Sequence, residues 1–182
     1  MWLVKMIMKN GKENTPMSLT KQHLIETIYQ EFSSRRIEKF TLVELSQKAT
    51  VCRSTIYNNF GGLEYVYKDL IEKIILKEIT RDCQSYEELI KNLVTYIYDN
   101  KMLCLNLYHQ IVPFINQEHV HRQIVEDFGK VLIQYNQEKV ISKVALDAFI
   151  LMLKKQFDNN LRTNQIEMIE ILVKYGHFLF NV

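Results

Sequence analysis

The side chains best suited to chemistry in this sequence are gathered in one short segment, from Arg53 to Phe60. Its eight residues, RSTIYNNF, include one arginine, five neutral side chains that form hydrogen bonds, and two large apolar residues, Ile56 and Phe60. On a helix the two apolar residues, four positions apart, share one face and leave the polar residues on the other. Arginine, serine, threonine, tyrosine and asparagine are the side chains that contact the phosphates and base edges of DNA. The segment therefore predicts a nucleic-acid-binding surface.

The residues just before this segment form the element that must position it. Thr41 and Glu44 have the spacing of a capping box, in which a hydroxyl caps the free backbone N–H groups that begin a helix. Apolar residues then recur at helical spacing up to Ala49, and a break at residues 50–52 precedes the polar segment. Two short helices joined by a tight turn are the pattern of a helix-turn-helix, whose second helix enters the major groove of DNA.

From about Ser18 to Lys77 the chain resembles the N-terminal domain of the TetR family of bacterial transcriptional regulators. It has a first helix at residues 21–32 and a second at 41–49, at the family's separation. The sequence TIYNNF at 55–60 stands where the family has its T-[LI]-Y-x-x-F signature, and an amphipathic helix follows the next two glycines. The resemblance covers about a third of the chain. It implies an all-α fold, with a three-helix DNA-binding head and a helical C-terminal body for ligand binding and dimerisation.

The function that the resemblance implies is a ligand-responsive transcriptional regulator, usually a repressor, that binds a pseudo-palindromic operator in double-stranded DNA as a homodimer. We expect the DNA contacts to come from the second and third helices of the head: Thr41, Lys48, Cys52, Arg53, Ser54, Thr55, Tyr57, Asn58 and Asn59. The alternative is a helical protein-interaction regulator that has lost sequence-specific DNA binding.

Three departures from the family pattern motivate that alternative. Thr50 stands where the family usually has glycine, and a β-branched residue resists a positive φ. Cys52 stands where a serine often caps the recognition helix, and Cys52 is read either as a tolerated replacement or as a redox-sensitive thiol at a helix N-terminus. Leu63 stands where many members carry a lysine that binds phosphate. Lys48 or Lys68 could replace that lysine in part.

The body offers a candidate effector site. A stripe of residues around the helix at 102–108 could line a cavity between the body helices: Met102, Cys104, Tyr108, His109 and Phe114. Such a cavity would suit a small apolar or aromatic effector. The alternative is that the stripe is ordinary core, since apolar stripes at helical spacing usually are.

The last two expected helices, at about 138–160 and 164–181, are the most apolar of the chain. A helix that is apolar over more than one stripe is buried on more than one side. We expect one side to pack in the protomer and the other to form a four-helix interface with a second copy, through Ala145, Phe149, Met152, Ile169 and Leu172. The alternative is a thick monomeric core.

Bulk composition narrows the class of protein. The chain has 182 residues, 47% of them hydrophobic, with only five glycines and two prolines, which favours helices around a real core. It contains no apolar run of the length that a membrane helix needs. We expect a flexible leader at 1–17, a helix-turn-helix domain at 18–62 and a regulatory and dimerisation domain at 63–182. The alternative for the leader is a basic arm that enters the minor groove.

Charge is distributed unevenly along the chain. Residues 1–81 hold 13 Lys and Arg against nine Asp and Glu, a net charge of +4, whereas residues 82–182 have a net charge of −2. The basic excess lies in the half that carries the helix-turn-helix. Arg35, Arg36 and Lys39 precede the second helix, where they could contact a DNA backbone or form a solvated loop.

Enzyme and cofactor motifs are missing from the sequence. There is no glycine-rich phosphate loop, no HExxH and no nucleophile elbow. The pair His119 and His121 would point in different directions on a helix, so we expect no metal site and no cofactor. The three cysteines have no metal-ligand spacing, and an odd number without a signal peptide favours reduced thiols in the cytoplasm. We therefore expect a regulator rather than an enzyme.

Overall fold

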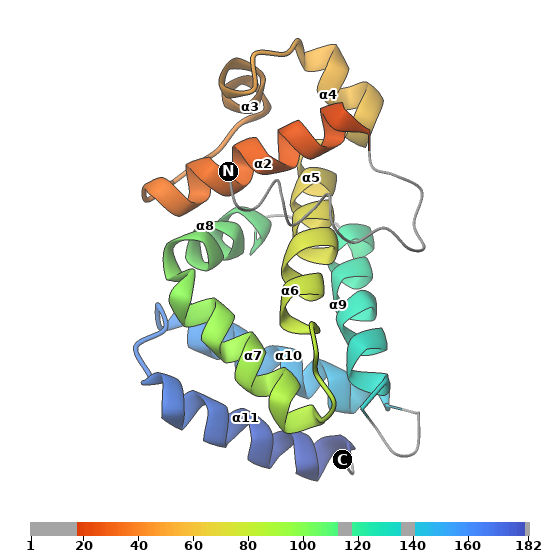
Figure 1. The fold of residues 1–182 in the computed structure, drawn as a ribbon, viewed down its shortest axis with the longest axis vertical. Coiled ribbons are helices and arrows are strands. Elements are labelled where there is room, and N and C mark those ends of the chain that lie inside the picture. The colour runs from red at the N-terminus through yellow and green to blue at the C-terminus, as the bar shows by residue number, and fades with distance from the viewer. Residues whose placement is uncertain (1–17, 113–117, 136–140, 181–182) are drawn as a thin grey trace.

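The computed structural model describes residues 18–112, 118–135 and 141–180, with side chains left out at 118–121 and 179–180 (Figure 1). These residues form helices and no strand. The head contains α2 (Leu19–Ser34), α3 (Leu42–Lys48) and α4 (Arg53–Phe60). A long helical segment runs from the head into the body as α5 (Leu63–Leu70), η1 (Ile71–Leu76) and α6 (Lys77–Ile79). The body continues with α7 (Tyr86–Asp99), α8 (Lys101–Ile111), α9 (Glu118–Ile133), α10 (Lys143–Asp158) and α11 (Gln165–Phe180).

The head folds as the sequence predicts. Thr41 Oγ1 accepts a hydrogen bond from the backbone N–H of Glu44, while the Glu44 carboxylate accepts one from the backbone N–H of Thr41, so the predicted capping box is confirmed. Ile56 is completely buried, which orients α4 on the rest of the head. Gly61 ends α4 in the left-handed region, at φ 84°, a conformation that glycine adopts without strain.

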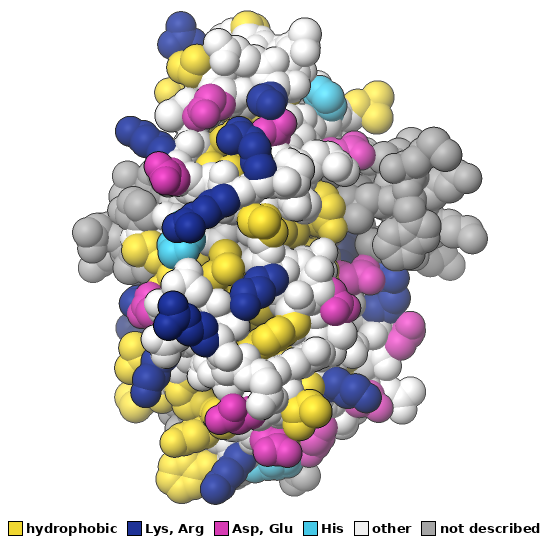
Figure 2. Space-filling model, turned by 90° about the vertical axis from the view of Figure 1, so that its left-hand side faces the viewer, with side chains coloured by type: hydrophobic (Ala, Val, Ile, Leu, Met, Phe, Trp, Pro, Cys, Tyr) yellow, Lys and Arg dark blue, Asp and Glu magenta, His cyan; other side chains and the backbone are white. Residues whose placement is uncertain are grey.

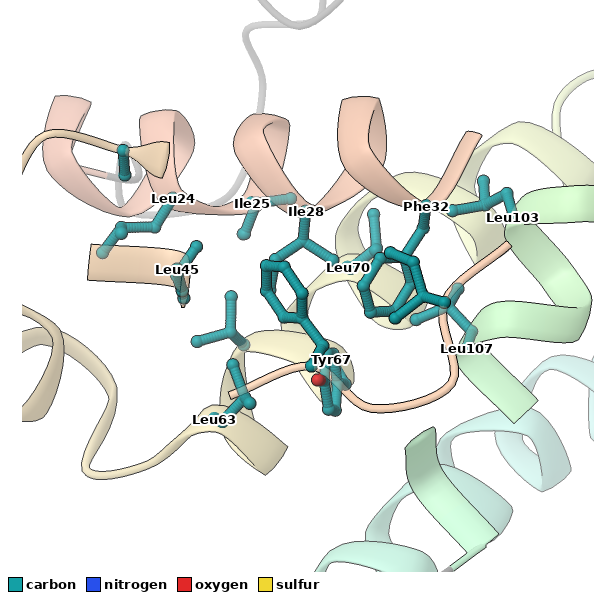
Figure 3. Packing of buried hydrophobic residues seen from close by; sticks show 14 of the residues in the cluster. Leu24, Ile25, Ile28, Phe32, Leu45, Leu63, Tyr67, Leu70, Leu103 and Leu107 are labelled. Atoms are coloured by element: carbon teal, nitrogen blue, oxygen red, sulfur yellow. The ribbon is translucent and has the colours of Figure 1, made fainter. Parts of the chain in front are cut away.

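The hydrophobic core of the head continues into the body. Leu24, Ile28 and Phe32 of α2 pack with Leu45 and with Tyr67 of α5, as Figure 3 shows. Apolar side chains of α8 complete the same cluster: Leu103 and Leu107. The expected domain boundary at residue 62 therefore passes through a continuous hydrophobic core.

Two amides of α8 hold the loop that joins α2 to α3. Asn106 is 2% exposed and Gln110 is 7% exposed. The Asn106 side chain accepts from the backbone N–H of Ile37 and donates to the backbone oxygens of Phe32 and Arg35, at 2.7–2.9 Å. Gln110 accepts from the backbone N–H of Phe40 at 2.9 Å. The body thereby supplies hydrogen bonds that the end of α2 and the following loop lack.

The long helical segment changes its winding between head and body. Its middle part, η1, has π-helical hydrogen bonding over Ile71–Leu76, a form that is rare and often found at functional sites. Just before it, Lys68 pairs with Glu72 at 2.8 Å and with Asp127 of α9 at 3.6 Å. This pairing ties the segment to the body.

The last helix, α11, packs closely on α7. The hydroxyl of Tyr86 donates to the backbone oxygen of Leu172 on α11 at 3.0 Å. A Cβ atom placed at Gly176 would lie only 1.8 Å from that hydroxyl oxygen. Glycine at this position therefore allows α7 and α11 to approach.

One expected helix boundary needs correction. The helix expected at 138–160 begins at Lys143, because Ser142 caps it with a hydrogen bond from the backbone N–H of Ala145. Residues 136–140 lie outside the described residues, as does the expected leader at 1–17.

Within the described ranges, no helix is both long and apolar enough to cross a membrane.

Candidate nucleic-acid interface

The outer face of α4 is polar and open. Arg53, Ser54 and Asn58 are exposed, and Tyr57 is 55% exposed, whereas Ile56 on the inner face is 0% exposed. In Figure 1 this helix lies at the top of the head, away from the body. The four exposed side chains are therefore available to a large ligand such as a DNA duplex.

Two of the expected DNA-contacting residues are engaged within the head. The side-chain amide of Asn59 donates to the backbone oxygen of Thr55 at 2.8 Å. The Ser18 hydroxyl lies 3.4 Å from the Asn59 side-chain oxygen, and both Thr55 and Asn59 are only partly exposed. These contacts favour a role for Asn59 in positioning α4.

The turn before α4 is strained at one residue. Thr50 has φ 55°, a conformation that is unfavourable for a β-branched side chain. The Ser46 hydroxyl donates to the backbone oxygen of Val51 at 2.6 Å, and the Val51 N–H donates to the backbone oxygen of Ser46 at 3.0 Å. His23 also contacts the backbone oxygen of Ala49 at 2.9 Å. These contacts hold the turn with Thr50 at a positive φ.

The N-terminus of α4 presents an exposed thiol. The Cys52 side chain makes no capping hydrogen bond to the backbone of α4. Its sulfur instead lies 2.9 Å from both the Ser54 and Thr55 hydroxyls, and these contacts lower the pKa of Cys52 to about 7. The first N–H groups of a helix are unpaired within it and favour a phosphate.

Basic residues near this face are partly neutralised. Lys48 pairs with Glu31 of α2 at 2.9 Å, and Arg35 pairs with the same carboxylate at 3.2 Å. The contact with Lys48, and then that with Arg35, lowers the pKa of Glu31. Arg36 and Lys39 are exposed in the loop before α3. A DNA backbone would compete with Glu31 for two of these four cations.

Neither candidate replacement for the phosphate-binding lysine is free. Leu63 is 8% exposed and belongs to the head core, so a lysine at that position would displace core packing. Lys68 is engaged with Glu72 and Asp127. Lys48 is the more accessible of the two lysines, because its side chain is 49% exposed although it forms an ion pair with Glu31.

An apolar cavity of about 250 Å³ lies in the body. Of the five expected pocket residues, Cys104 and Tyr108 line it, Met102 and His109 are exposed outside its lining, and Phe114 lies outside the described residues. Burial raises the pKa of Cys104 to about 12, so its thiol is neutral. The cavity therefore offers mainly apolar contacts.

Much of the cavity wall comes from residues that the sequence did not single out as pocket residues. The long helical segment contributes an aliphatic side, and α9 and α10 contribute two aromatic rings: Ile71, Ile75, Leu76, Ile79, Phe128 and Phe157. The apolar face of the 63–75 helix was the signal that could have pointed to them. At one end, Tyr108 donates a hydrogen bond to Asp158, which also pairs with Lys154 at 2.8 Å.

Three of the five expected interface residues lie inside the protomer. Ala145 is 6%, Phe149 0% and Leu172 1% exposed, so their side chains are unavailable to a second copy, which corrects the expected interface. Met152 and Ile169 are partly buried against the same core. Sequence periodicity identified two apolar stripes but not which of them faces inward.

The exposed apolar side chains of α10 and α11 lie on other faces of these helices. They include Val144 at 79%, Leu151 at 65%, Tyr175 at 48% and Phe178 at 81% exposed. Figure 2 shows hydrophobic side chains gathered at the lower left of the face it presents, at the end of the molecule where α10 and α11 lie in Figure 1.

Among the residues that the structure describes, no group of His, Cys, Asp and Glu could hold a metal ion.

Comparison with solved structures identifies the fold. The chain matches a crystal structure of a candidate TetR-family transcriptional regulator from Mesorhizobium loti, with a TM-score of 0.53 and 13% identity over 92% of this chain and 98% of that chain. It also matches the dihydroxyacetone kinase operon activator DhaS, with a TM-score of 0.49 and 15% identity over 90% of this chain and 95% of that one. The sequence matches no protein-family model and no curated protein. The chain has the all-α fold of TetR-family regulators.

Proposed function

We propose that the chain is a transcriptional regulator that binds double-stranded DNA through the outer face of α4. The observation that carries this proposal is the contrast on one short helix between buried Ile56 and exposed Arg53, Ser54, Tyr57 and Asn58. The fold supports it, since a solved chain of the same fold is described as a transcriptional regulator. Such a protein would act in the cytoplasm, where the bacterial chromosome lies.

Two copies of α4 would read two half-sites of a pseudo-palindromic operator. The half-sites of helix-turn-helix dimers lie one helical turn apart, about 34–36 Å, or a multiple of that distance. We propose that Tyr57 contacts a phosphate and that Arg53 contacts a base edge or a phosphate. Bound to a promoter region, the dimer would repress transcription by occupying the operator.

The homodimer would form through α10 and α11. Contiguous exposed apolar surface marks interaction sites on proteins, and Leu151 and Phe178 are mostly exposed in the single chain. A second copy that packs against these side chains would bury them in a four-helix interface. This arrangement leaves the head free at the opposite end (Figure 1).

The apolar cavity would hold a small apolar or aromatic effector. Its position beside η1 and α8 supports this proposal, because α8 also holds the loop before α3 through Asn106 and Gln110. An effector shifts the equilibrium between two conformations only as far as it binds one of them more tightly. Movement of α8 on binding would change the position of the DNA-binding helices.

A mobility-shift assay with the DNA upstream of the chain's own gene tests DNA binding. Arg53→Ala and Tyr57→Ala should each weaken binding, by about 1–3 kcal/mol if Arg53 makes a base contact. Gln30→Ala, at an exposed position of α2, is the control and should bind like wild type. Equal binding by all four proteins would show that α4 is not the recognition helix.

The second candidate is a helical interaction regulator without sequence-specific DNA binding. The observations in its favour are the buried Leu63 and the engagement of Lys48 with Glu31. It predicts no specific shift at low salt although the protein remains folded and dimeric.

Light scattering tests the dimer independently of DNA. Leu151→Glu and Phe178→Glu should give folded monomers, since both side chains are exposed in the protomer. Phe149→Glu should instead unfold the protein, since that side chain is fully buried. A wild-type monomer at micromolar concentration would contradict the proposed assembly.

A further inference from the structure

A second cavity, with a more polar lining than the first, lies where the head meets the body. Its volume is about 400 Å³, within the range of small-molecule sites. Tyr29 of α2 lines it from the head, and Glu78, Tyr96 and Asp99 line it from the body. Ile79 is the one residue that it shares with the apolar cavity among the linings that the structure describes.

Two oxygen atoms of residues that line this junction cavity are buried and make no hydrogen bond of good geometry. They are the hydroxyl oxygen of Tyr96 and one carboxylate oxygen, Oε2, of Glu78. Nη2 of Arg81 lies 2.8 Å from that oxygen and forms an ion pair with it by distance, but without the geometry of a hydrogen bond. The Tyr96 hydroxyl interacts with that of Tyr29. Both buried atoms therefore have a neighbour within the fold, and the charge of the lining is the better guide to a ligand.

The charges around the cavity favour a cation. Glu78 is balanced by Arg81, but Asp99 has no cationic partner in the described part of the chain. Asp99 is the exposed last residue of α7, and a negative charge at a helix C-terminus is unfavourable. The lining residues therefore carry a net charge of −1, placed where the fold itself does not compensate it.

The two tyrosines suit the same ligand. Burial raises the pKa values of Tyr29 and Tyr96, so both phenols are neutral at physiological pH. Neutral aromatic rings attract cations through their faces. The Tyr29 hydroxyl interacts with that of Tyr96 and lies 3.5 Å from the Asn100 side-chain oxygen.

We propose that the junction cavity binds a small aliphatic amine in its ammonium form, which donates hydrogen bonds to Glu78 and Asp99 beside Tyr96. An ammonium group has three donors and no acceptor, which matches a lining rich in oxygen acceptors. A polyol of the same size could donate hydrogen bonds but would leave the charge of Asp99 unbalanced, and a carboxylate would be repelled.

The bound amine would contact the head through Tyr29 and the body through Glu78 and Tyr96, so it would hold one against the other. An effect of the amine on DNA binding rests on the proposed function. Amine binding itself does not, because none of the cavity residues belongs to α4 or to the apolar cavity's aromatic wall.

Titration calorimetry with three probes of equal length tests the proposal. 1,5-Diaminopentane should bind saturably, 1,5-pentanediol should bind weaker by about tenfold or more, and glutarate should not bind. Failure of the diamine to bind wild-type protein, or equal binding of all three probes, would overturn the proposal.

Variants then assign the site. Asp99→Asn should weaken diamine binding about tenfold without lowering the melting temperature, because the wild-type charge lies at an unfavourable helix end. Tyr96→Phe should also weaken binding, because it removes a hydroxyl from the cavity lining and frees the Tyr29 hydroxyl that interacts with it. Glu170→Gln, an exposed carboxylate of α11, is the matched control.

Unchanged affinity in Asp99→Asn would show that the amine binds elsewhere and would overturn the assignment. If the wild-type protein binds the diamine but no DNA, the proposed function alone is refuted. Intact DNA binding without diamine binding would refute the junction site alone.

Discussion

The strongest single prediction concerns Asn106, through which the body holds the head. Asn106→Leu keeps the approximate size of the side chain but removes three hydrogen bonds, at 2.7–2.9 Å, to the backbone of Ile37, Phe32 and Arg35. A buried backbone group left without a partner costs about 1–3 kcal/mol. Arg35 is exposed, so its carbonyl can turn to water. The other two groups lose their partner, and we expect a loss of about 2–6 kcal/mol from the free energy of unfolding.

Urea unfolding followed by circular dichroism measures this loss. Gln30→Leu, the same kind of change at an exposed position of α2, is the control and should change stability by less than about 0.5 kcal/mol. Amide hydrogen exchange adds a local readout, because the N–H of Ile37 should lose its protection in Asn106→Leu.

A polar variant at the same position separates hydrogen bonding from packing. In Asn106→Asp the introduced carboxylate can still accept from Ile37 but faces the oxygens of Phe32 and Arg35 without a proton to donate. Its folded-state pKa should therefore be raised, so the variant gains stability relative to wild type as pH falls. A loss below about 1 kcal/mol in both variants, with unchanged exchange at Ile37, would refute the claim that this contact holds the loop.

Three further predictions follow from single positions. Thr50→Gly should raise the free energy of unfolding by about 0.5–1 kcal/mol, because it relieves a positive φ of 55° at some cost in chain entropy; a lower stability in urea would mean that the threonine side chain makes a compensating contact. Gly176→Ala should lower stability by about 1–3 kcal/mol and the melting temperature with it, since the new methyl group would lie 1.8 Å from the Tyr86 hydroxyl oxygen; an unchanged melting temperature would show that α7 and α11 can separate freely. Cys52 should react with iodoacetamide at half its maximal rate near pH 7, because its pKa is lowered to about 7. Cys104, whose pKa is raised to about 12, should stay unmodified in the folded protein. Half-maximal labelling of Cys52 above pH 8.5, the range of an ordinary thiol, would refute the role of the neighbouring hydroxyls.

Local sequence signals predicted the head well because each of them acts within a few residues. The capping box of Thr41 and Glu44 and the two apolar positions of α4 depend on helical spacing alone. For Thr50, comparison with the glycine expected in that turn left two alternatives, a strained residue or a differently built turn, and its φ of 55° corresponds to the first. Most of α4 could therefore be assigned to an inner or an outer face before the structure was known.

The body was less predictable, because its assignments depend on what lies across the fold. Phe149 and Leu151 are both apolar and only two positions apart, yet one is buried and the other 65% exposed. Periodicity cannot decide which stripe faces the protomer's own core. The cavity wall was harder still, since the π-helical turns of η1 change the angular spacing of Ile71, Ile75 and Leu76. The amides of Asn106 and Gln110 gave no signal, because their partners lie about 70 residues away.

That distance along the chain also has a consequence during protein synthesis. The loop before α3 cannot form its hydrogen bond to Asn106 until that residue, 69 positions after Ile37, has been synthesised. At about 5–20 residues per second, the ribosome takes roughly 3–14 s to extend the chain that far. Through this interval the apolar side of α2 lacks Leu103 and Leu107. The nascent DNA-binding segment should therefore stay incompletely folded and open to chaperones until α8 has emerged.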